Sequence, residues 1–279
     1  MQKTITVELI EEFRQYLYDK EKSANTIEKY VRDVFKLMEF VGDKALEKPD
    51  ILLYKKEICK VYAPKSVNSM LSSINAFFMM LGWYELKVKT LKIQRRIFAA
   101  RERELTKTEY ERLLAAAKNR GNERMYYLIQ TIGSTGIRIS ELRYVSVEAV
   151  RNGCADIDCK GKIRQVFLPK RLCKILNVYI KKHNIKKGPV FVSKNGKPLD
   201  RSNIWRMLQS LCEEAHVSPQ KVFPHNFRHL FARTYYSFQK DIVRLADILG
   251  HSNINTTRIY TMESGEIYKK QIECLGLLC

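Results

Sequence analysis

Six side chains between residues 138 and 260 are of the types that could transfer a phosphoryl group without a metal ion. They are two arginines, one lysine, two histidines and one tyrosine, namely Arg138, Lys160, His225, Arg228, His251 and Tyr260. Two arginine forks can neutralise the non-bridging oxygens of a pentacoordinate phosphorane. A tyrosine oxygen can attack in line and form a covalent phosphoester, which keeps the energy of the phosphodiester bond.

Proton transfer would be the task of the other groups. A phenol is too weakly acidic to be ionised at pH 7, so the tyrosine needs a positive field or a histidine base. The leaving 5′-oxygen needs a proton, and a lysine on a mobile turn can deliver it. The sequence contains no carboxylate cluster spaced for Mg²⁺ and no Walker loop for ATP. We therefore expect neither a metal site nor a cofactor.

The first arginine lies in an unusual apolar setting. Gly136 allows a sharp turn into a predicted helix whose first turns carry Arg138 and Glu141 on one face. Arg138 is surrounded in sequence by isoleucine and leucine, and a half-buried arginine needs an acceptor. Glu141 or a ligand phosphate could serve, so a structural ion pair and a functional site explain this motif equally well.

The lysine lies where the sequence changes its period. Residues 154–169 predict a strand, a tight turn and a second strand, which places Lys160 and Lys162 at the tip of a hairpin. A lysine at such a tip usually points into water. A flexible ammonium group on a turn could also reach into a groove of DNA.

The histidines lie in two further motifs. Pro224 suits a helix start, and the helix would hold His225, Arg228 and His229 close together. A zinc site is not indicated, because no third ligand has the necessary spacing. A Leu-Gly-His turn ends at His251, and a short predicted helix leads from it to Tyr260, nine residues later.

Composition indicates a folded protein that binds a polyanion. The chain has 279 residues, a formal net charge of +20 and 45% hydrophobic residues, enough for two packed domains. No apolar run approaches the roughly 18 residues that span a bilayer, and the N-terminus has no apolar signal core. The seven cysteines form no CxxC pair. Reduced thiols and a cytoplasmic location are therefore expected, with no membrane contact.

The overall pattern predicts a mainly α protein with two domains. The first hundred residues read as four or five short amphipathic helices with little strand character. Beyond them, helices alternate with the predicted hairpin, which is typical of an α+β domain with a small antiparallel sheet. We assign an all-α domain to residues 1–84, a basic linker to 85–104, and a catalytic domain to 105–279 with a C-terminal tail at 262–279.

Basic residues crowd into the predicted linker. A solvated linker is one interpretation, and a strap that lies along DNA phosphates is the other. The side chains proposed for DNA binding are Lys87, Lys89, Lys92, Arg95, Arg96 and Arg101.

Taken in order, these motifs resemble those of the tyrosine recombinases, the phage-integrase family of site-specific DNA recombinases. The resemblance covers residues 105–261, and the helical first domain is similar to the family's core-binding domain. The early start of the helical module favours a simple, Xer-like member. The motifs that carry the likeness are Thr135–Leu142, Lys160–Arg164, His225–His229, and Leu249–His251 with Tyr260.

The resemblance implies a role for each group. Arg138 and Arg228 would clamp the scissile phosphate, and His251 would hydrogen-bond one of its non-bridging oxygens. Tyr260 would be the nucleophile and form a 3′-phosphotyrosyl intermediate. The supporting assignments are His225 as base, Lys160 as acid for the leaving group, Glu141 as a buttress, and Lys162 and His229 as neighbours. The hairpin is one residue shorter than the usual GKGxKxR form and carries Cys159 where glycine is common, so Lys162 remains an alternative acid.

The resemblance also implies partners. Members of the family bind double-stranded DNA at inverted-repeat sites as four protomers on two duplexes, and are monomers or dimers off DNA. Many pass a C-terminal helix to a neighbour, and residues 262–279 have an apolar side that could dock either on a neighbour or on their own domain. The reaction would be integration, excision or dimer resolution. Two alternatives remain: a non-catalytic, sequence-specific DNA-binding protein and a type IB topoisomerase.

Overall fold

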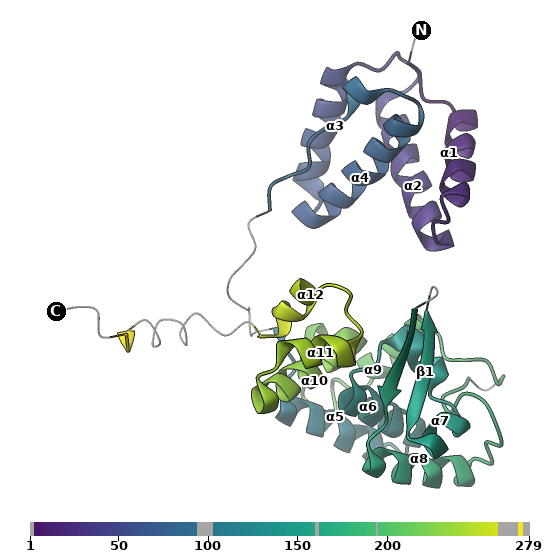
Figure 1. Ribbon diagram of the computed structural model, residues 1–279, viewed down its shortest axis with the longest axis vertical. Helices are drawn as coiled ribbons and strands as arrows, with labels where there is room; N and C mark the ends of the chain where they lie inside the picture. Colours follow the sequence, from purple (N-terminus) through teal and green to yellow (C-terminus); the bar gives the residue numbers. More distant parts are fainter. Residues whose placement is uncertain (1–2, 94–102, 160–161, 194, 262–272, 276–279) are drawn as a thin grey trace. The chain divides into compact units, whose positions relative to one another are not determined.

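The computed structural model describes residues 3–93, 103–159, 162–193, 195–261 and 273–275. The chain divides into two units, Met1–Arg95 and Arg96–Cys279 (Figure 1). Within the described residues no helix is long and apolar enough to cross a membrane.

The described part of the first unit, residues 3–93, consists of four α-helices and one 3₁₀ turn around an apolar core. Its aromatic centre is formed by Phe13, Phe77 and Phe78, which are fully buried. Local chemistry sets the helix starts: a capping box joins Glu47 and Asp50, and Pro64 opens the last α-helix. The elements are α1 (Val7–Asp19), α2 (Ala24–Val41), α3 (Lys48–Val61), α4 (Pro64–Met80) and η1 (Tyr84–Leu86).

The described part of the predicted linker is packed against this first unit. The Asn75 amide donates to the carbonyl of Val88 at 2.8 Å and accepts from its N–H at 3.0 Å. Asn68 holds Leu91 in the same way, at 2.9 and 2.7 Å. Leu86 and Val88 are buried, whereas Lys87, Lys89 and Lys92 are exposed. After η1, residues 87–93 therefore form an extended strap on the helical unit with its lysines facing solvent.

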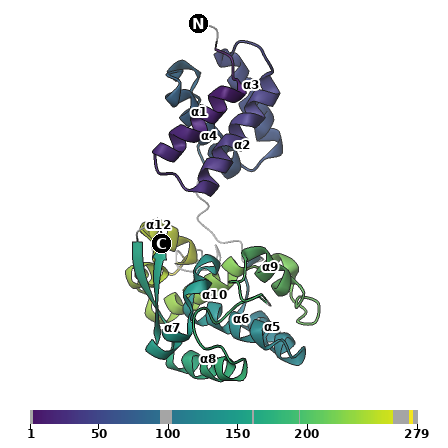
Figure 2. The same cartoon turned by 90° about the vertical axis from the view of Figure 1, so that its right-hand side faces the viewer.

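The second unit is a helical body with a hairpin at its edge (Figures 1 and 2). Helix α6 contacts α5, α8 and α10, and α7 contacts the first strand of the hairpin. The elements are α5 (Lys107–Asn119), α6 (Glu123–Thr135), η3 (Ile139–Tyr144), α7 (Val147–Asn152), β1 (Cys154–Cys159), β2 (Lys162–Phe167), α8 (Lys170–Lys182), α9 (Arg201–Gln209), η4 (Pro219–Lys221), α10 (Pro224–Gln239), α11 (Ile242–Leu249), α12 (Ile254–Arg258) and η5 (Ile259–Thr261).

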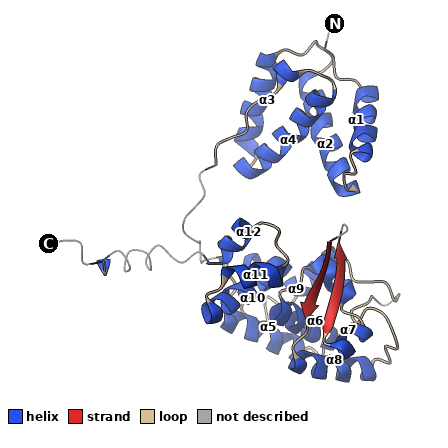
Figure 3. Ribbon diagram, in the orientation of Figure 1, coloured by secondary structure: helices blue, strands red, loops and turns tan. Residues whose placement is uncertain are grey.

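The two strands form the one sheet of the described residues (Figure 3). They are antiparallel, with Cys154 opposite Phe167 at one end and Cys159 opposite Lys162 at the other. Ala155, Ile157 and Val166 are buried against the helices. The predicted fold class, mainly α with a small antiparallel sheet in the second domain, is confirmed.

One local prediction was wrong. The segment after Gly136 is a 3₁₀ helix, Ile139–Tyr144, and Arg138 is its N-cap in an extended conformation. The cause is visible in the cap: Glu141 turns its carboxylate back to accept the backbone N–H of Arg138 at 2.9 Å. Because Arg138 precedes the helix, its side chain can extend away from it, and it reaches the carbonyl of Gly250 after α11.

Candidate active site

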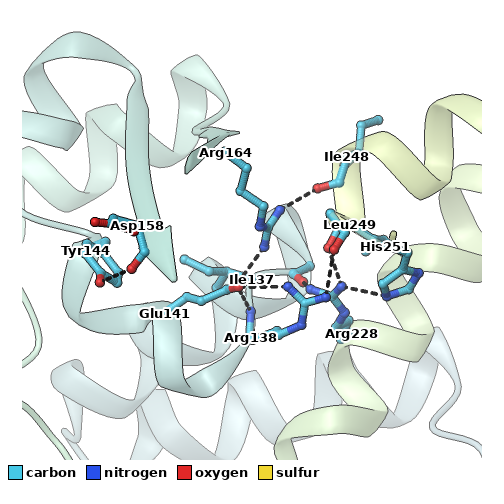
Figure 4. Close-up of polar contacts among 12 residues, drawn as sticks. Ile137, Arg138, Glu141, Tyr144, Asp158, Arg164, Arg228, Ile248, Leu249 and His251 are labelled. Atoms are coloured by element: carbon cyan, nitrogen blue, oxygen red, sulfur yellow. Dashed lines mark hydrogen bonds and ion pairs between the residues drawn. The ribbon is translucent and has the colours of Figure 1, made fainter. Parts of the chain in front are cut away.

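The candidate site lies in the second unit and draws its residues from η3 and its N-cap, from α10, from the end of α11 and from η5. Figure 4 shows its arginines, Glu141 and His251. Helix α6 reaches this point and ends at Gly136, whose φ of +62° reverses the chain towards Arg138. A Cβ at Gly136 would lie 2.4 Å from Cδ1 of Phe231, so only glycine allows this close approach to α10. The turn brings the first arginine next to the second.

Arg228 is buried at the centre of the site, with only 2% of its surface exposed. Its guanidinium donates to the carbonyl oxygens of Gly136 and Leu249, both at 2.6 Å. Among the described residues it forms no ion pair with a carboxylate. Burial and the nearby Arg138 lower the pKa of Arg228 to about 10, so the group still carries its charge at neutral pH. A buried cation in this state is costly unless an anion joins it.

Arg138 is held by two acceptors. Its Nη1 donates to Oε1 of Glu141 at 2.8 Å, and its Nη2 donates to the carbonyl of Gly250 at 3.0 Å. The arginine side chain is 38% exposed, whereas Glu141 is 2% exposed as a residue. Burial alone would raise the pKa of Glu141, but the hydrogen bonds from Arg138 and Arg164 outweigh it and hold that pKa below its usual value.

His251 adjoins Arg228 and is polarised by it. Nε2 of His251 lies 3.0 Å from Nη2 of Arg228, and Nδ1 lies 2.8 Å from Oγ1 of Thr257. Because a guanidinium has only donors, Nε2 must be the acceptor and the ring hydrogen is assigned to Nδ1. Burial and the charge of Arg228 lower the pKa of His251 to about 4, so the ring is neutral at pH 7.

The two histidines of α10 form an edge-to-face pair next to the tyrosine. The ring centroids of His225 and His229 are 4.6 Å apart, and those of His229 and Tyr260 are 4.5 Å apart. Burial lowers the pKa of His229 to about 3 and also lowers the pKa of the more exposed His225, with Arg228 adding to both shifts. All three histidines of the site are therefore neutral at pH 7.

Tyr260 is placed by an apolar cluster. It is 4% exposed and packs with Ala232, Leu245 and Leu249. Its ring stacks on His251 at a centroid distance of 5.9 Å and an interplanar angle of 19°. Tyr260 also counteracts the lowering of the Arg228 pKa, through charge and hydrogen bonding. The phenol is thus adjacent to the buried guanidinium.

The structure brings together most of the residues that the sequence singled out. Arg138, Glu141, Arg228, His251 and Tyr260 meet through the contacts above, with His225 and His229 alongside. Lys160 lies outside the described residues, and for Lys162 only the backbone, paired with Cys159, is described. Arg95, Arg96 and Arg101 also lie outside them. No group of three potential metal ligands occurs in the described part of the chain.

Sequence reasoning assigned no role to Arg164 or Thr257. Arg164 is on β2 and donates to Oε2 of Glu141 at 2.6 Å. A signal for it exists in the strand alternation, because Arg164 shares a strand face with the buried Val166. An arginine on the inward face of a strand requires a buried acceptor, so the pattern alone could have identified it. Thr257 carries no comparable signal.

The chain is similar to known proteins over most of its length. Residues 103–266 match the Phage integrase family, and residues 10–85 match its N-terminal SAM-like domain. Tyrosine recombinase XerA of Pyrococcus furiosus is 28% identical over 287 residues, which cover 99% of this chain and 97% of that protein.

Solved structures show the same fold. The crystal structure of XerA recombinase superposes with a TM-score of 0.54 at 25% identity, covering 98% of this chain and 99% of that one. A lambda integrase tetramer bound to a Holliday junction superposes with a TM-score of 0.72 at 14% identity, covering 92% and 77%. The family match spans more than half of the chain and contains every residue of the site described above. This chain therefore belongs to the phage integrase family and is a tyrosine recombinase.

Proposed function

We propose that this chain cleaves and rejoins DNA at a specific site through a 3′-phosphotyrosyl intermediate on Tyr260. The observation that carries the proposal is the buried Arg228, which is hydrogen-bonded to carbonyl oxygens, an imidazole and the neighbouring Tyr260 but, among the described residues, pairs with no carboxylate. A phosphodiester in the site would supply the missing negative charge. Arg138, whose side chain is 38% exposed, would bind the same phosphate from the open side.

In the proposed step the Tyr260 oxygen attacks phosphorus, and the bond from phosphorus to the 5′-oxygen breaks. We assign the proton of the phenol to His225, whose lowered pKa leaves its ring free to accept it at neutral pH. The leaving 5′-oxygen takes a proton from Lys160, with Lys162 as the alternative donor. Attack by a 5′-hydroxyl on the phosphotyrosyl bond reverses these events and restores the phenol.

His251 would change its role when DNA binds. In the free protein its Nε2 accepts a hydrogen bond from Arg228. A phosphate oxygen is a stronger acceptor, and it would take over that donor. Its negative charge would also raise the pKa of His251 from the low value that Arg228 imposes. The ring would then carry a proton on Nε2 as well and donate a hydrogen bond from it to a non-bridging oxygen.

The same proposal assigns DNA binding to the first unit and to the linker. Residues 1–84 would form the core-binding domain, 85–104 the linker and 105–279 the catalytic domain. The exposed Lys87, Lys89 and Lys92 would contact phosphates. The lambda integrase structure is a tetramer on a Holliday junction, and by analogy this chain would act as a tetramer on two duplexes with inverted-repeat sites. The tail 262–279, of which only residues 273–275 are described, would dock on a neighbour or on its own domain.

Cleavage on a suicide substrate tests the proposal. The DNA site is first recovered by purifying covalent protein–DNA complexes from cells under denaturing conditions and sequencing the joined ends. On a nicked duplex of that sequence, the native chain should form a covalent complex, and Tyr260→Phe should bind equally well but form none. Tyr236→Phe, which alters another phenol near the cluster, should cleave like the native chain.

Each other outcome selects a different function. A covalent complex that persists in Tyr260→Phe would show that the nucleophile is another residue. Site-specific binding without any covalent complex from the native chain would indicate a DNA-binding protein. Relaxation of a supercoiled plasmid that lacks the site would indicate a topoisomerase.

A further inference from the structure

Arg164 on β2 contacts both of the groups that hold Arg138. Its side chain is only 17% exposed. Figure 4 shows its guanidinium spanning the gap between Glu141 on one side and Ile248 on the other. None of the roles assigned above uses this arginine.

The first shared group is the carboxylate of Glu141. Oε1 accepts from the Arg138 guanidinium at 2.8 Å, and Oε2 accepts from Nη2 of Arg164 at 2.6 Å. Oε2 also accepts the backbone N–H of Arg138 at 2.9 Å. Arg164 therefore fixes the oxygen that caps Arg138 and, through the rigid carboxylate, the oxygen that orients its guanidinium.

The second shared group is the chain reversal at Gly250. Arg138 donates to the Gly250 carbonyl at 3.0 Å, and Arg164 donates to the carbonyl of Ile248, two residues earlier, at 2.8 Å. The Arg164 side chain also lies directly against Gly250. A Cβ at that glycine, whose φ is +63°, would be 2.4 Å from Cδ of Arg164. Arg164 thus positions both acceptors of Arg138.

Charge gives this arrangement a second consequence. One carboxylate, Glu141, faces two guanidinium groups, so the three residues together keep one positive charge. If Arg164 lost its charge, Glu141 would neutralise Arg138 alone. Arg138 would then bind Glu141 more strongly and attract a phosphate less.

We propose that Arg164 is a positioning residue that keeps Arg138 oriented and electrostatically available for the scissile phosphate. Arg164 does not itself touch the phosphate in this account. The proposal rests on the function proposed above, because it concerns the efficiency of the phosphate clamp. Two contacts tie the hairpin to neighbouring elements: the partly buried Arg164 on β2, and the hydrogen bond from the Tyr144 hydroxyl to the carbonyl of Asp158 (Figure 4).

A double-mutant cycle separates charge balance from a purely structural role. Arg164→Met keeps an unbranched side chain similar to the aliphatic part of arginine but removes the guanidinium and its charge. It should slow cleavage of the suicide substrate about 10- to 100-fold with little change in DNA affinity. Arg164→Lys should fall between the native chain and Arg164→Met, because it keeps the charge and one hydrogen bond. Glu141→Gln should slow cleavage through loss of the cap.

The combination Arg164→Met with Glu141→Gln decides the matter. It removes one charge of each sign and should cleave faster than Arg164→Met alone, because Arg138 then regains its full charge. If the two losses simply multiply, Arg164 acts only by supporting the hairpin, and the proposal is overturned. Urea unfolding of each variant establishes that the chains compared are folded.

A second readout does not depend on cleavage. In the full chain labelled with ¹³C at glutamate, the carboxyl signal of Glu141 is identified by its loss in Glu141→Gln. Its pKa should be higher in Arg164→Met than in the native chain, and an unchanged pKa would contradict the proposal. If the native chain forms no covalent complex, the proposed function is wrong. The pKa of Glu141 in Arg164→Met would still show whether Arg164 acts on Glu141.

Discussion

Each unit of the chain buries a charged cluster, and the two clusters differ in how their charge is balanced. In the first unit, Asp33 is 3% exposed and accepts from Lys29 at 2.6 Å and from the Ser73 hydroxyl at 2.8 Å. The lysine also donates to the carbonyl of Ser69. One anion is paired with one cation, so this cluster has no net charge and needs no ligand to balance it.

Among the described residues of the site in the second unit, three guanidinium groups face one carboxylate. Arg138 and Arg164 share Glu141, and Arg228 is held by carbonyl oxygens and an imidazole. Carbonyl oxygens satisfy hydrogen bonds without cancelling charge, which leaves an excess of two positive charges in a largely buried site. A buried charge does not by itself indicate a functional site, because the charge of Asp33 is balanced by Lys29. A buried charge without a counter-charge does indicate one, because it needs a ligand of the opposite sign.

The largest expected effect comes from removing the uncancelled charge. Arg228→Met should slow cleavage about 1,000-fold, since the phosphate loses its buried partner. The free energy of unfolding should change by less than about 1 kcal/mol, because relief of the buried charge offsets the lost hydrogen bonds. Suicide-substrate kinetics and urea unfolding measure the two quantities.

A matched control lies on the same helix. Arg233 on α10 is partly rather than fully buried, and it is paired with Glu104 and donates to the carbonyl of Leu105. Arg233→Met should therefore lower the free energy of unfolding but leave the cleavage rate of the folded protein close to the native value. If Arg228→Met unfolded the protein and Arg233→Met abolished cleavage, the contrast between cancelled and uncancelled charge would be lost.

The neutral cluster should show the opposite pattern. Asp33→Ala leaves Lys29 without its anion and should lower the free energy of unfolding of the first unit by about 2 kcal/mol. Cleavage by DNA-saturated protein should stay at the native rate, because the cluster belongs to the first unit and none of its residues is assigned to the site in the second unit. A cleavage defect at saturating protein would mean that the first cluster also serves catalysis.

An intermediate effect is expected from small anions. Sulfate should bind the excess charge of the second unit and raise the Tm of the native chain by about 2 °C more than that of Arg228→Met. Calorimetry at matched ionic strength with chloride separates binding from general salt effects. Equal shifts in the two proteins would show that no anion binds at Arg228.

The smallest effect concerns pH. His251 has a pKa of about 4 in the folded chain and about 6.5 when unfolded. Between these values the unfolded chain binds more protons, so the stability contributed by the neutral ring is complete above pH 6.5 and is lost as pH falls towards 4. Urea unfolding at pH 7.5 and pH 5 should show a smaller loss for His251→Gln than for the native chain. An identical loss would assign the dependence to other groups.

Much of the fold and of the site could be predicted from local sequence. Three local signals predicted elements of the fold: the apolar periodicity of α1 to α4, the prolines at helix starts, and the change of period at residues 154–169. Each signal lies within or next to the element that it predicts. Residue types also singled out Arg138, Arg228 and Tyr260 as groups suited to the same chemistry, and the structure places them close together. The functional roles of these side chains remain predictions.

Other features depend on contacts between distant segments and could not be predicted. Arg164 and the carbonyl of Ile248 are 84 residues apart, and a carbonyl acceptor has no sequence signature. The 3₁₀ cap at Arg138 depends on how Glu141 is shared. Similarly, the docking of residues 85–93 depends on Asn68 and Asn75, whose amides could equally have faced solvent.

Mass spectrometry of the DNA-linked peptide tests the central claim most directly. Trypsin would release residues 259–269, a peptide that contains both Tyr260 and Tyr268. After nuclease digestion of the covalent complex, fragmentation should place a 3′-linked nucleotide on Tyr260, with Tyr268 unmodified. A nucleotide on Tyr268, on a 5′ end or on a peptide elsewhere in the chain would contradict the account.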